Sequence, residues 1–138
     1  MMSPGRIVLA SASPRRRDLL QAIGCEFIVD ASDIDETEHA GEDPVAYVQR
    51  VAIGKARAFH ALPDDLIIAA DTTVDVDGRI LAKPVDADDA RRMLALLNGR
   101  THLVHSAIAV RFANTCEFGV ETTAVTFRSL SSDRRAHV

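Results

Sequence analysis

Side chains that bind anions follow a short apolar run near the N-terminus of the chain. Ser11 and Ser13 come directly after the run Ile7–Ala10, and the arginines Arg15 and Arg16 come next. Hydroxyl groups and the free N–H groups at a helix N-terminus donate hydrogen bonds to an anion, and arginine binds phosphate through two parallel hydrogen bonds. These residues therefore predict a phosphate-binding turn, and they fit a capped surface helix with a solvated basic face equally well.

Two acidic side chains are candidates for proton transfer or metal binding. Asp71 follows the apolar run Leu66–Ala70. We therefore expect it at the C-terminal end of a buried strand, where open α/β sheets bind their ligands. The alternative for Asp71 is a structural role as the cap of the following turn. Glu36 lies in the acidic segment Ala31–Asp43, for which a solvated loop is favoured over a metal-binding or ligand-binding role.

Two lysines complete the set of charged candidates. Lys55 lies on a predicted helix over Pro44–His60, and Lys83 follows a predicted β-hairpin. Each lysine taken alone fits a solvated surface charge. Together with the serines, arginines and carboxylates, they form the set that a metal-dependent phosphate enzyme needs. Cations neutralise a polyphosphate, carboxylates hold a hard divalent ion, and one carboxylate orients or deprotonates water.

The length of 138 residues predicts a single domain over residues 1–138, and the elements that must position these residues are strands and helices in turn. Asp77-Gly78, between two alternating segments, is a strong signal for a β-hairpin. The expected strands are Ile7–Ala10, Cys25–Asp30, Leu66–Ala70, Val74–Val76, Arg79–Leu81, Thr101–Arg111 and Glu117–Arg128, and the expected helices are one between the cap Ser13 and the stop Gly24, Pro44–His60 and Asp86–Asn98.

The composition narrows the class of protein. The formal net charge of −4 argues against sequence-independent nucleic-acid binding, so any basic site must be local. Cys25 and Cys116 lack a Cys-x-x-Cys spacing, which favours core residues in a reducing compartment over metal ligands. His102 and His105 are expected on opposite faces of one strand, so they do not form a zinc-binding pair. With no signal peptide and no apolar run of membrane-spanning length, we expect a cytoplasmic protein that binds neither nucleic acid nor a membrane.

Six short motifs stand in an order and spacing typical of one enzyme family. They are Ser11-Ala12-Ser13-Pro14-Arg15-Arg16, Asp35-Glu36, Lys55-Ala56, Ala70-Asp71-Thr72, Lys83-Pro84 and Gly99-Arg100-Thr101-His102. In this combination the chain resembles, from Ile7 onward, the Maf family of nucleoside triphosphate pyrophosphatases. The resemblance implies an α/β fold with a mixed twisted sheet flanked by helices, related to the inosine triphosphate pyrophosphatases, with a cleft between two lobes. The implied reaction converts a nucleoside triphosphate and water into the monophosphate and pyrophosphate.

The resemblance also implies roles for individual residues. Asp71 would accept the proton of the attacking water, and Glu36 and Asp71 would hold a divalent metal ion, Mg²⁺ or alternatively Mn²⁺. Thr72 and Arg15 are similar to the members that act on dTTP and UTP, whereas the 7-methyl-GTP type tends to carry Gln in place of Thr72. The side chains implied to bind the nucleoside triphosphate are Ser11, Ser13, Arg15, Arg16, Lys55, Thr72 and Lys83. The resemblance is also compatible with a homodimer.

The sequence departs from the family pattern at two places. Gly54 stands where members often carry Glu, and we expect this change to affect helix stability more than chemistry. Members continue beyond the position of Val138, with a glutamine that helps to select the base, so we expect a C-terminally shortened form. Within the chain, Ser131–Val138 resembles the start of a capped helix.

Two alternatives to an active pyrophosphatase remain at this point. One is a non-catalytic, nucleotide-binding regulator of cell division and septum formation. The other is an inactive, shortened form without independent function. Tight nucleotide binding without product, unchanged by Asp71→Asn, would identify the regulator, whereas a cooperative thermal melt would argue against a fragment that does not fold alone.

Overall fold

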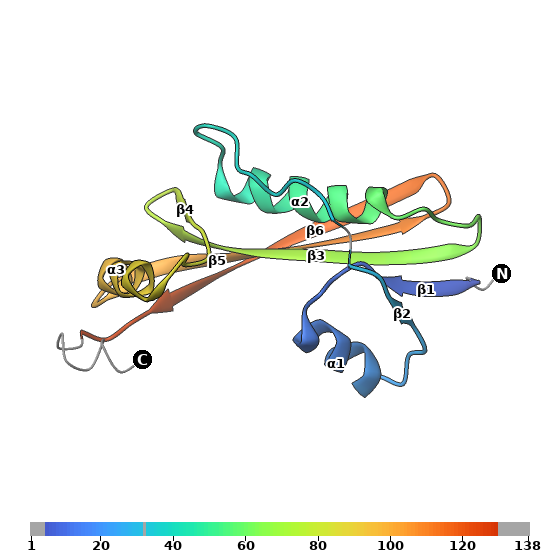
Figure 1. The fold of residues 1–138 in the computed structure, drawn as a ribbon, viewed down its shortest axis with the longest axis horizontal. Helices are drawn as coiled ribbons and strands as arrows, with labels where there is room; N and C mark the ends of the chain where they lie inside the picture. The colour runs from blue at the N-terminus through green and yellow to red at the C-terminus, as the bar shows by residue number, and fades with distance from the viewer. Residues whose placement is uncertain (1–4, 32, 130–138) are drawn as a thin grey trace.

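The computed structural model describes residues 5–31 and 33–129, which form a mixed β-sheet with helices on both sides (Figure 1). Along the chain the elements are β1 (Arg6–Leu9), α1 (Pro14–Ala22), β2 (Ile28–Val29), α2 (Pro44–Ala58), β3 (Asp65–Val76), β4 (Arg79–Leu81), α3 (Ala87–Leu97), β5 (Thr101–Phe112) and β6 (Thr115–Thr126). The strands lie in the order β2-β1-β3-β5-β6, and β4 pairs with β3 off this path. The predicted α/β class is confirmed.

The sheet combines a parallel and an antiparallel part. β1 runs parallel to both β2 and β3, while β3, β5 and β6 are antiparallel neighbours. A crossover through α1 joins β1 to β2, as parallel strands require, and a tight turn joins β5 to β6. The hairpin predicted at Asp77 and Gly78 is present, and these two turn residues have positive φ angles of 53° and 82°.

Two strands differ in length from the sequence prediction. β2 is only Ile28–Val29, shorter than the expected strand Cys25–Asp30. β3 joins the two expected strands Leu66–Ala70 and Val74–Val76 into one, because β5 pairs with it from Leu66 through to Asp75 without interruption. Asp71 therefore lies inside a long strand, and the prediction that it stands at a strand end is wrong. A period-two pattern with polar residues on both faces hides the continuation from sequence reasoning.

The core lies between the sheet and α2. Most of the side chains that build it are alanines and valines, which let the helix lie close against the strands. The fully buried members of this cluster are Val8, Ala10, Val48, Ala52, Ala56, Ile67, Ala69, Ala107 and Ala109. Of the two free cysteines, Cys116 packs against this cluster, while Cys25 is half-buried elsewhere. One face of the sheet is thus tightly packed.

The opposite face is less covered. α1 lies on the other side of the sheet from α2 (Figure 1) and contributes no buried side chain, and its Leu19 and Ile23 are 66% and 76% exposed. The predicted boundaries of α1 are confirmed: Ser13 caps its first turn, and Gly24 follows it with a φ of 75°. This helix is therefore held by its caps and by the polar contacts described below more than by burial.

Two further expectations concern the surface and the C-terminus. No helix within residues 5–31 and 33–129 has the length and apolar character needed to cross a membrane. The helix start predicted at Ser131–Val138 lies outside the described residues.

Candidate active site

A short stretch of β3 has a free edge between its two partners on one side. β1 pairs with β3 only as far as Ile68, and β4 begins to pair at Val74. The other edge of β3 is occupied by β5 over the whole interval. Asp71 and Thr72 lie in the gap that remains. Because successive side chains on a strand point to opposite faces, the side chains of Asp71 and Thr72 lie on different sides of the sheet.

On the α2 side, two carboxylates share one ammonium group. Lys55 Nζ on α2 lies 3.4 Å from Asp71 Oδ1 and 3.4 Å from Glu36 Oε1. The same nitrogen lies 3.4 Å from the carbonyl oxygen of Ala70. The side chains of Lys55 and Asp71 are each only 13% exposed, whereas that of Glu36 is 49% exposed. The structure thus brings together Glu36, Lys55 and Asp71, three residues that lie far apart in the sequence.

Burial dominates the electrostatics of Asp71. Removal of water raises the pKa of its carboxyl group above the ordinary value, the ammonium of Lys55 lowers it in part, and the negative charge of Glu36 raises it again. The guanidinium of Arg16 acts in the lowering direction. A half-buried carboxylate with a raised pKa is a better proton acceptor than an exposed one, and such a group is typical of functional sites.

On the α1 side, hydroxyl groups surround one arginine. Arg16 Nη1 donates to Ser11 Oγ at 3.1 Å, and Arg16 Nη2 donates to Thr72 Oγ1 at 3.2 Å. Thr72 Oγ1 lies 3.1 Å from Ser106 Oγ on β5. Ser13 Oγ accepts from the backbone N–H of Arg16 at 3.4 Å and so fixes the start of α1. The guanidinium of Arg16 is thereby held beside the gap in β3.

The acidic segment before α2 is exposed, as predicted, and it is also tied to the helix. Tyr47 donates its hydroxyl hydrogen to the carbonyl oxygen of Glu36 at 2.6 Å. Arg50 pairs with Glu42 at 2.8 Å and donates to the carbonyl oxygen of Thr37 at 2.9 Å. The Arg50 guanidinium lowers the pKa of Glu42 to about 2. These contacts hold the backbone of Glu36 over the α2 side of the gap.

Gly54 has a packing role in the same region. A Cβ atom at this position would approach Ile34 Cδ1 to 3.1 Å, closer than ordinary contact allows. Glycine therefore lets the segment that carries Glu36 lie against α2. This adds to the sequence interpretation, which expected Gly54 to affect helix stability more than chemistry.

Two predicted substrate-binding residues are not joined to the cluster. Arg15 is exposed on α1, and Lys83 is exposed in the connection that follows β4. Neither side chain forms a hydrogen bond or ion pair with another residue in the described part of the chain. Lys83 comes two residues after Leu81, which pairs with Val74 at the border of the gap. The connection that carries Lys83 therefore leaves the sheet next to Asp71 and Thr72.

Comparison with known families and structures places this site in context. The sequence pattern described as "Maf-like protein" matches residues 6–137. The chain belongs to the Maf family. A protein of Myxococcus xanthus named "dTTP/UTP pyrophosphatase" is 50% identical over 127 residues, which cover 91% of this chain and 64% of the relative. A protein of Anaeromyxobacter dehalogenans with the same name is 52% identical over 124 residues, covering 90% of this chain and 61% of the relative.

This Maf chain thus spans a little less than two thirds of the length of those relatives. Among solved structures, it is similar to the Ham1 protein of Staphylococcus aureus, with a TM-score of 0.53 and 18% identity over 87% of this chain and 69% of that one. A dITP/XTP pyrophosphatase of Mycobacterium abscessus gives a TM-score of 0.52 and 14% identity over 88% and 73% of the two chains. At this level of identity the similarity shows a shared fold.

The donor set of the Maf chain fits a divalent cation in part. Glu36 and Asp71 present hard carboxylate oxygens to the same positive charge, that of Lys55 Nζ, and Mg²⁺ takes oxygen ligands of this kind. Among the described residues, no group of three or more His, Cys, Asp or Glu side chains is placed to hold a metal ion. Two carboxylates without a third protein ligand suit Mg²⁺, which usually keeps several waters and binds substrate phosphates as well.

Sequence reasoning missed two polar residues of the Maf site. Ser106 contacts Thr72 because β5 pairs with β3, with Thr72 directly opposite Ser106. Tyr47 reaches the backbone of Glu36 from the first turns of α2. The pKa of its hydroxyl is raised by burial first and then by the charges of Asp71 and Glu36. The three-residue spacing of Tyr47 and Arg50 is a signal for one polar face of α2 turned toward the acidic segment.

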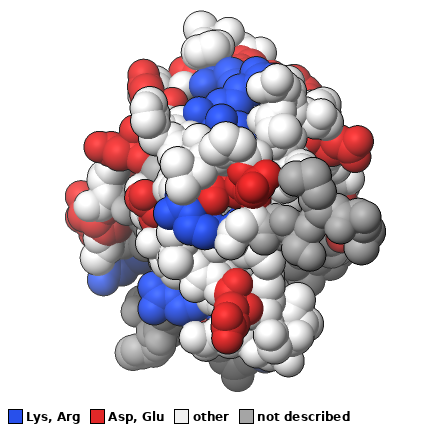
Figure 2. Space-filling model, turned by 90° about the vertical axis from the view of Figure 1, so that its right-hand side faces the viewer, with Lys and Arg blue, Asp and Glu red and all other residues white. Residues whose placement is uncertain are grey.

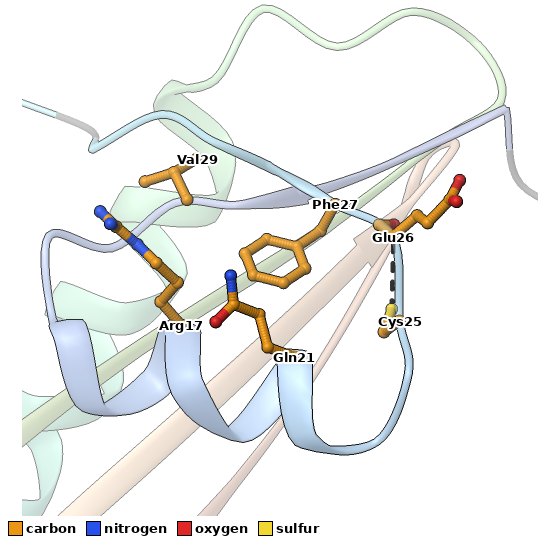
Figure 3. A pocket seen from close by; sticks show the side chains of 6 residues that line it. All are labelled: Arg17, Gln21, Cys25, Glu26, Phe27 and Val29. Carbon is orange, nitrogen blue, oxygen red and sulfur yellow. Dashed lines mark hydrogen bonds between the residues drawn. The ribbon is translucent and has the colours of Figure 1, made fainter.

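A pocket in the described surface lies away from the candidate site. It is formed between α1 and the segment leading into β2, with Arg17 and Gln21 turned toward Phe27 and Val29 (Figure 3). It includes none of the residues predicted for the site. Figure 2 shows blue and red residues interspersed on the face seen there, so the positive charges on that face do not merge into one broad surface.

Proposed function

We propose that the chain hydrolyses nucleoside triphosphates, with dTTP and UTP as preferred substrates, to the monophosphate and pyrophosphate. The observation that carries the proposal is the gap in β3, where Asp71 shares Lys55 with Glu36 while Thr72, its neighbour, contacts Arg16. A proton acceptor and phosphate-binding cations thus stand at one opening of the sheet. The names of the Myxococcus and Anaeromyxobacter relatives support the same reaction.

Asp71 is the proton acceptor in this proposal. Its half-buried carboxylate takes a proton from water, and the water oxygen attacks the α-phosphorus of the substrate. The bond between the α-phosphorus and the bridging oxygen to the β-phosphate breaks, and the electron pair leaves with pyrophosphate. The raised pKa of Asp71 supports this role, because it brings the carboxylate closer to the basicity that general-base catalysis at neutral pH requires.

The cations around the gap bind the charged part of the substrate. Arg16, fixed by Ser11 and Thr72, offers a rigid guanidinium to phosphate oxygens. Lys55 balances Asp71 and Glu36 and faces the same opening. The exposed Arg15 and Lys83, together with Ser13, complete the predicted binding set. Phosphoryl chemistry of this type depends on positioning and charge neutralisation more than on covalent catalysis.

Glu36 and Asp71 would hold the divalent cation, Mg²⁺ or alternatively Mn²⁺. When bound, the cation would withdraw charge from the phosphate oxygens and balance the pyrophosphate that leaves. Lys55 already bridges the two carboxylates, so the ammonium and the cation are expected to compete for the same oxygens.

The preference for a pyrimidine triphosphate rests on the family resemblance at Thr72 and Arg15 and on the names of the relatives. We also propose that the protein acts in the cytoplasm, where nucleoside triphosphates are made, and that it forms a homodimer. Fractionation and light scattering test them.

The decisive experiment is a nucleotide panel with direct detection of pyrophosphate, in the presence of Mg²⁺, Mn²⁺ or a chelator. We expect pyrophosphate release from dTTP and UTP with a divalent cation, and its loss with the chelator or in Asp71→Asn. Tight nucleotide binding without any product, unchanged in Asp71→Asn, would contradict the proposal and favour a regulatory binding protein.

A further inference from the structure

A buried polar cluster outside the site joins three strands of the sheet. His105 Nε2 on β5 lies 2.7 Å from Asp75 Oδ2 on β3, and His105 Nδ1 lies 2.7 Å from Thr122 Oγ1 on β6. His105 and Asp75 are only 3% and 7% exposed. Because a carboxylate accepts hydrogen bonds and does not donate them, the ring nitrogen facing Asp75 carries a proton. In the described part of the chain, neither side chain forms a hydrogen bond or ion pair with a residue assigned to substrate.

The cluster continues into the turn of the β3–β4 hairpin. Asp75 Oδ1, the second oxygen of the same carboxylate, accepts from the backbone N–H of Gly78 at 2.8 Å. A second contact holds the turn from outside, where Arg100 forms an ion pair with Asp77. Asp75 is therefore the link between the buried histidine and the hairpin turn, and both of its oxygens are used.

This hairpin sets the position of Lys83. Its short returning strand β4 pairs with β3 over only three residues, ending with Leu81 opposite Val74. Lys83 follows two residues later at the border of the gap, and no hydrogen bond or ion pair with the described part of the chain fixes its side chain. The placement of Lys83 thus depends on the backbone before it, and the backbone depends on the turn.

We propose that Asp75 and His105 are positioning residues for substrate binding, because they fix the β3–β4 hairpin so that Lys83 stands beside the phosphate-binding gap. The inference rests on the proposed function for its kinetic consequence. The physical reason is that a buried carboxylate must be paired: His105 satisfies one oxygen and the turn satisfies the other. Without His105, one oxygen of the Asp75 carboxylate loses its partner, so the side chain is expected to move toward water. The β3–β4 turn, which is bound to the other oxygen, is then expected to move as well.

The first test compares three variants at the histidine and its partner. His105→Leu removes both hydrogen bonds of the ring and is expected to raise KM for the nucleotide about fivefold to tenfold, with kcat changed by less than about twofold. His105→Gln retains an N–H donor toward Asp75 and is expected to recover most of the wild-type KM. Thr122→Val, which removes only the outer hydrogen bond, serves as the control and should change KM by less than about twofold.

The second test asks whether the effect passes through Lys83. In a Lys83→Ala background, His105→Leu is expected to cause no further rise in KM, because the residue that the hairpin positions is gone. An equal rise in both backgrounds, or a fall in kcat at constant KM, would overturn the proposal. If His105→Leu does not fold, Asp75→Asn is measured in the same two backgrounds, with a smaller expected rise of about threefold.

A third measurement does not depend on activity. Amide hydrogen exchange at Gly78 should be faster in His105→Leu than in the wild type and unchanged in Lys83→Ala. If the wild type releases no pyrophosphate from any nucleotide, the proposed function fails, and the Kd for inorganic tripolyphosphate replaces KM in the same cycle. Unchanged exchange at Gly78 in His105→Leu would refute the positioning role whether or not the chain is an enzyme.

Discussion

The two faces of β3 beside the gap hold their polar side chains in different ways. On the α2 side, Asp71 and Lys55 are nearly buried against a core of small side chains, and burial controls the charge state of the carboxylate. On the α1 side, Arg16 and Thr72 are held by hydrogen bonds next to a helix that buries no side chain. Adjacent residues of a single strand therefore belong to two different environments.

In the proposed reaction, the two faces have different tasks. A proton acceptor benefits from removal of water, because desolvation raises the pKa of a carboxyl group. A polyphosphate needs cations that water and substrate can reach, which an exposed face provides. Both kinds of side chain lie at the free edge between β1 and β4, because Asp71 and Thr72 are neighbours there and point to opposite faces of the sheet.

The largest expected effect on the rate comes from replacing the buried carboxylate on the α2 side. Asp71→Asn should lower the rate of pyrophosphate release by about 10²–10⁴-fold, the range for loss of a general base. Because the pKa of Asp71 is raised in the folded chain, its stabilising contribution is present below the ordinary pKa and is lost as pH rises. The Asn variant should therefore melt no lower than the wild type at pH near 7.

Asp64→Asn, which changes an exposed carboxylate in the turn immediately before β3, is the matched control for that variant. It should leave the rate unchanged. Equal loss of activity in both variants would show that Asp71 has no special role.

Removal of the shared ammonium is expected to have the next largest effect. Lys55→Met leaves Asp71 and Glu36 without the charge that lowers the pKa of Asp71, so this pKa should rise further. We expect a loss in kcat/KM of about tenfold to a hundredfold, and the acidic limb of the pH–rate profile should move to higher pH. An unshifted profile would contradict the coupling between the two residues.

On the exposed face we expect a smaller effect, on binding more than on rate. Arg16→Lys keeps the charge and loses the fork that reaches both Ser11 and Thr72, so KM should rise about threefold to tenfold with little change in kcat. Arg15→Lys, at a neighbouring and unpaired arginine, is the comparison and should change KM less. Equal effects would mean that charge alone matters at the start of α1.

The smallest effect tests how firmly the segment carrying Glu36 is tied to α2. Arg50 lowers the pKa of Glu42 to about 2, so their pair stabilises the fold above the ordinary pKa of a glutamate and loses this contribution as pH falls toward about 2. Arg50→Gln should melt at a lower temperature than the wild type at pH near 7, and the two melting temperatures should converge in strong acid. Thermal melts across this pH range check both parts.

Several parts of the fold follow from local signals in the sequence. Ser13 and Pro14 predict the start of α1, and Asp77-Gly78 predicts the tight hairpin that the structure contains. The buried character of Leu66–Ala70 predicts its central place in the sheet. Such features depend on residues within a few positions of one another, which is why sequence reasoning finds them.

Sequence reasoning identified several residues of the candidate site, but it did not identify all of the contacts between them. Motif order selected Asp71, Lys55 and Glu36 together, and these residues do meet. The same reasoning could not find Ser106 or Tyr47, because their contacts depend on the β3–β5 register and on the path of the acidic segment over α2. It also divided β3 into two strands, since the partner strand β5 that pairs across the break lies far along the chain, with Asp71 opposite Ala107 and Asp75 opposite Leu103.

For this protein, the sequence by itself determined the family, the helix caps, the hairpin turns and the inventory of charged side chains. Only the tertiary structure decided that Asp71 lies within β3 at a free edge, that its neighbour Thr72 faces the opposite side, and that His105 is buried against Asp75. The physical reason is the distance along the chain over which each interaction acts. Caps, turns and motifs act over a few residues, whereas register, burial and the pKa of a carboxylate are set by strands and helices that meet only after the chain has folded.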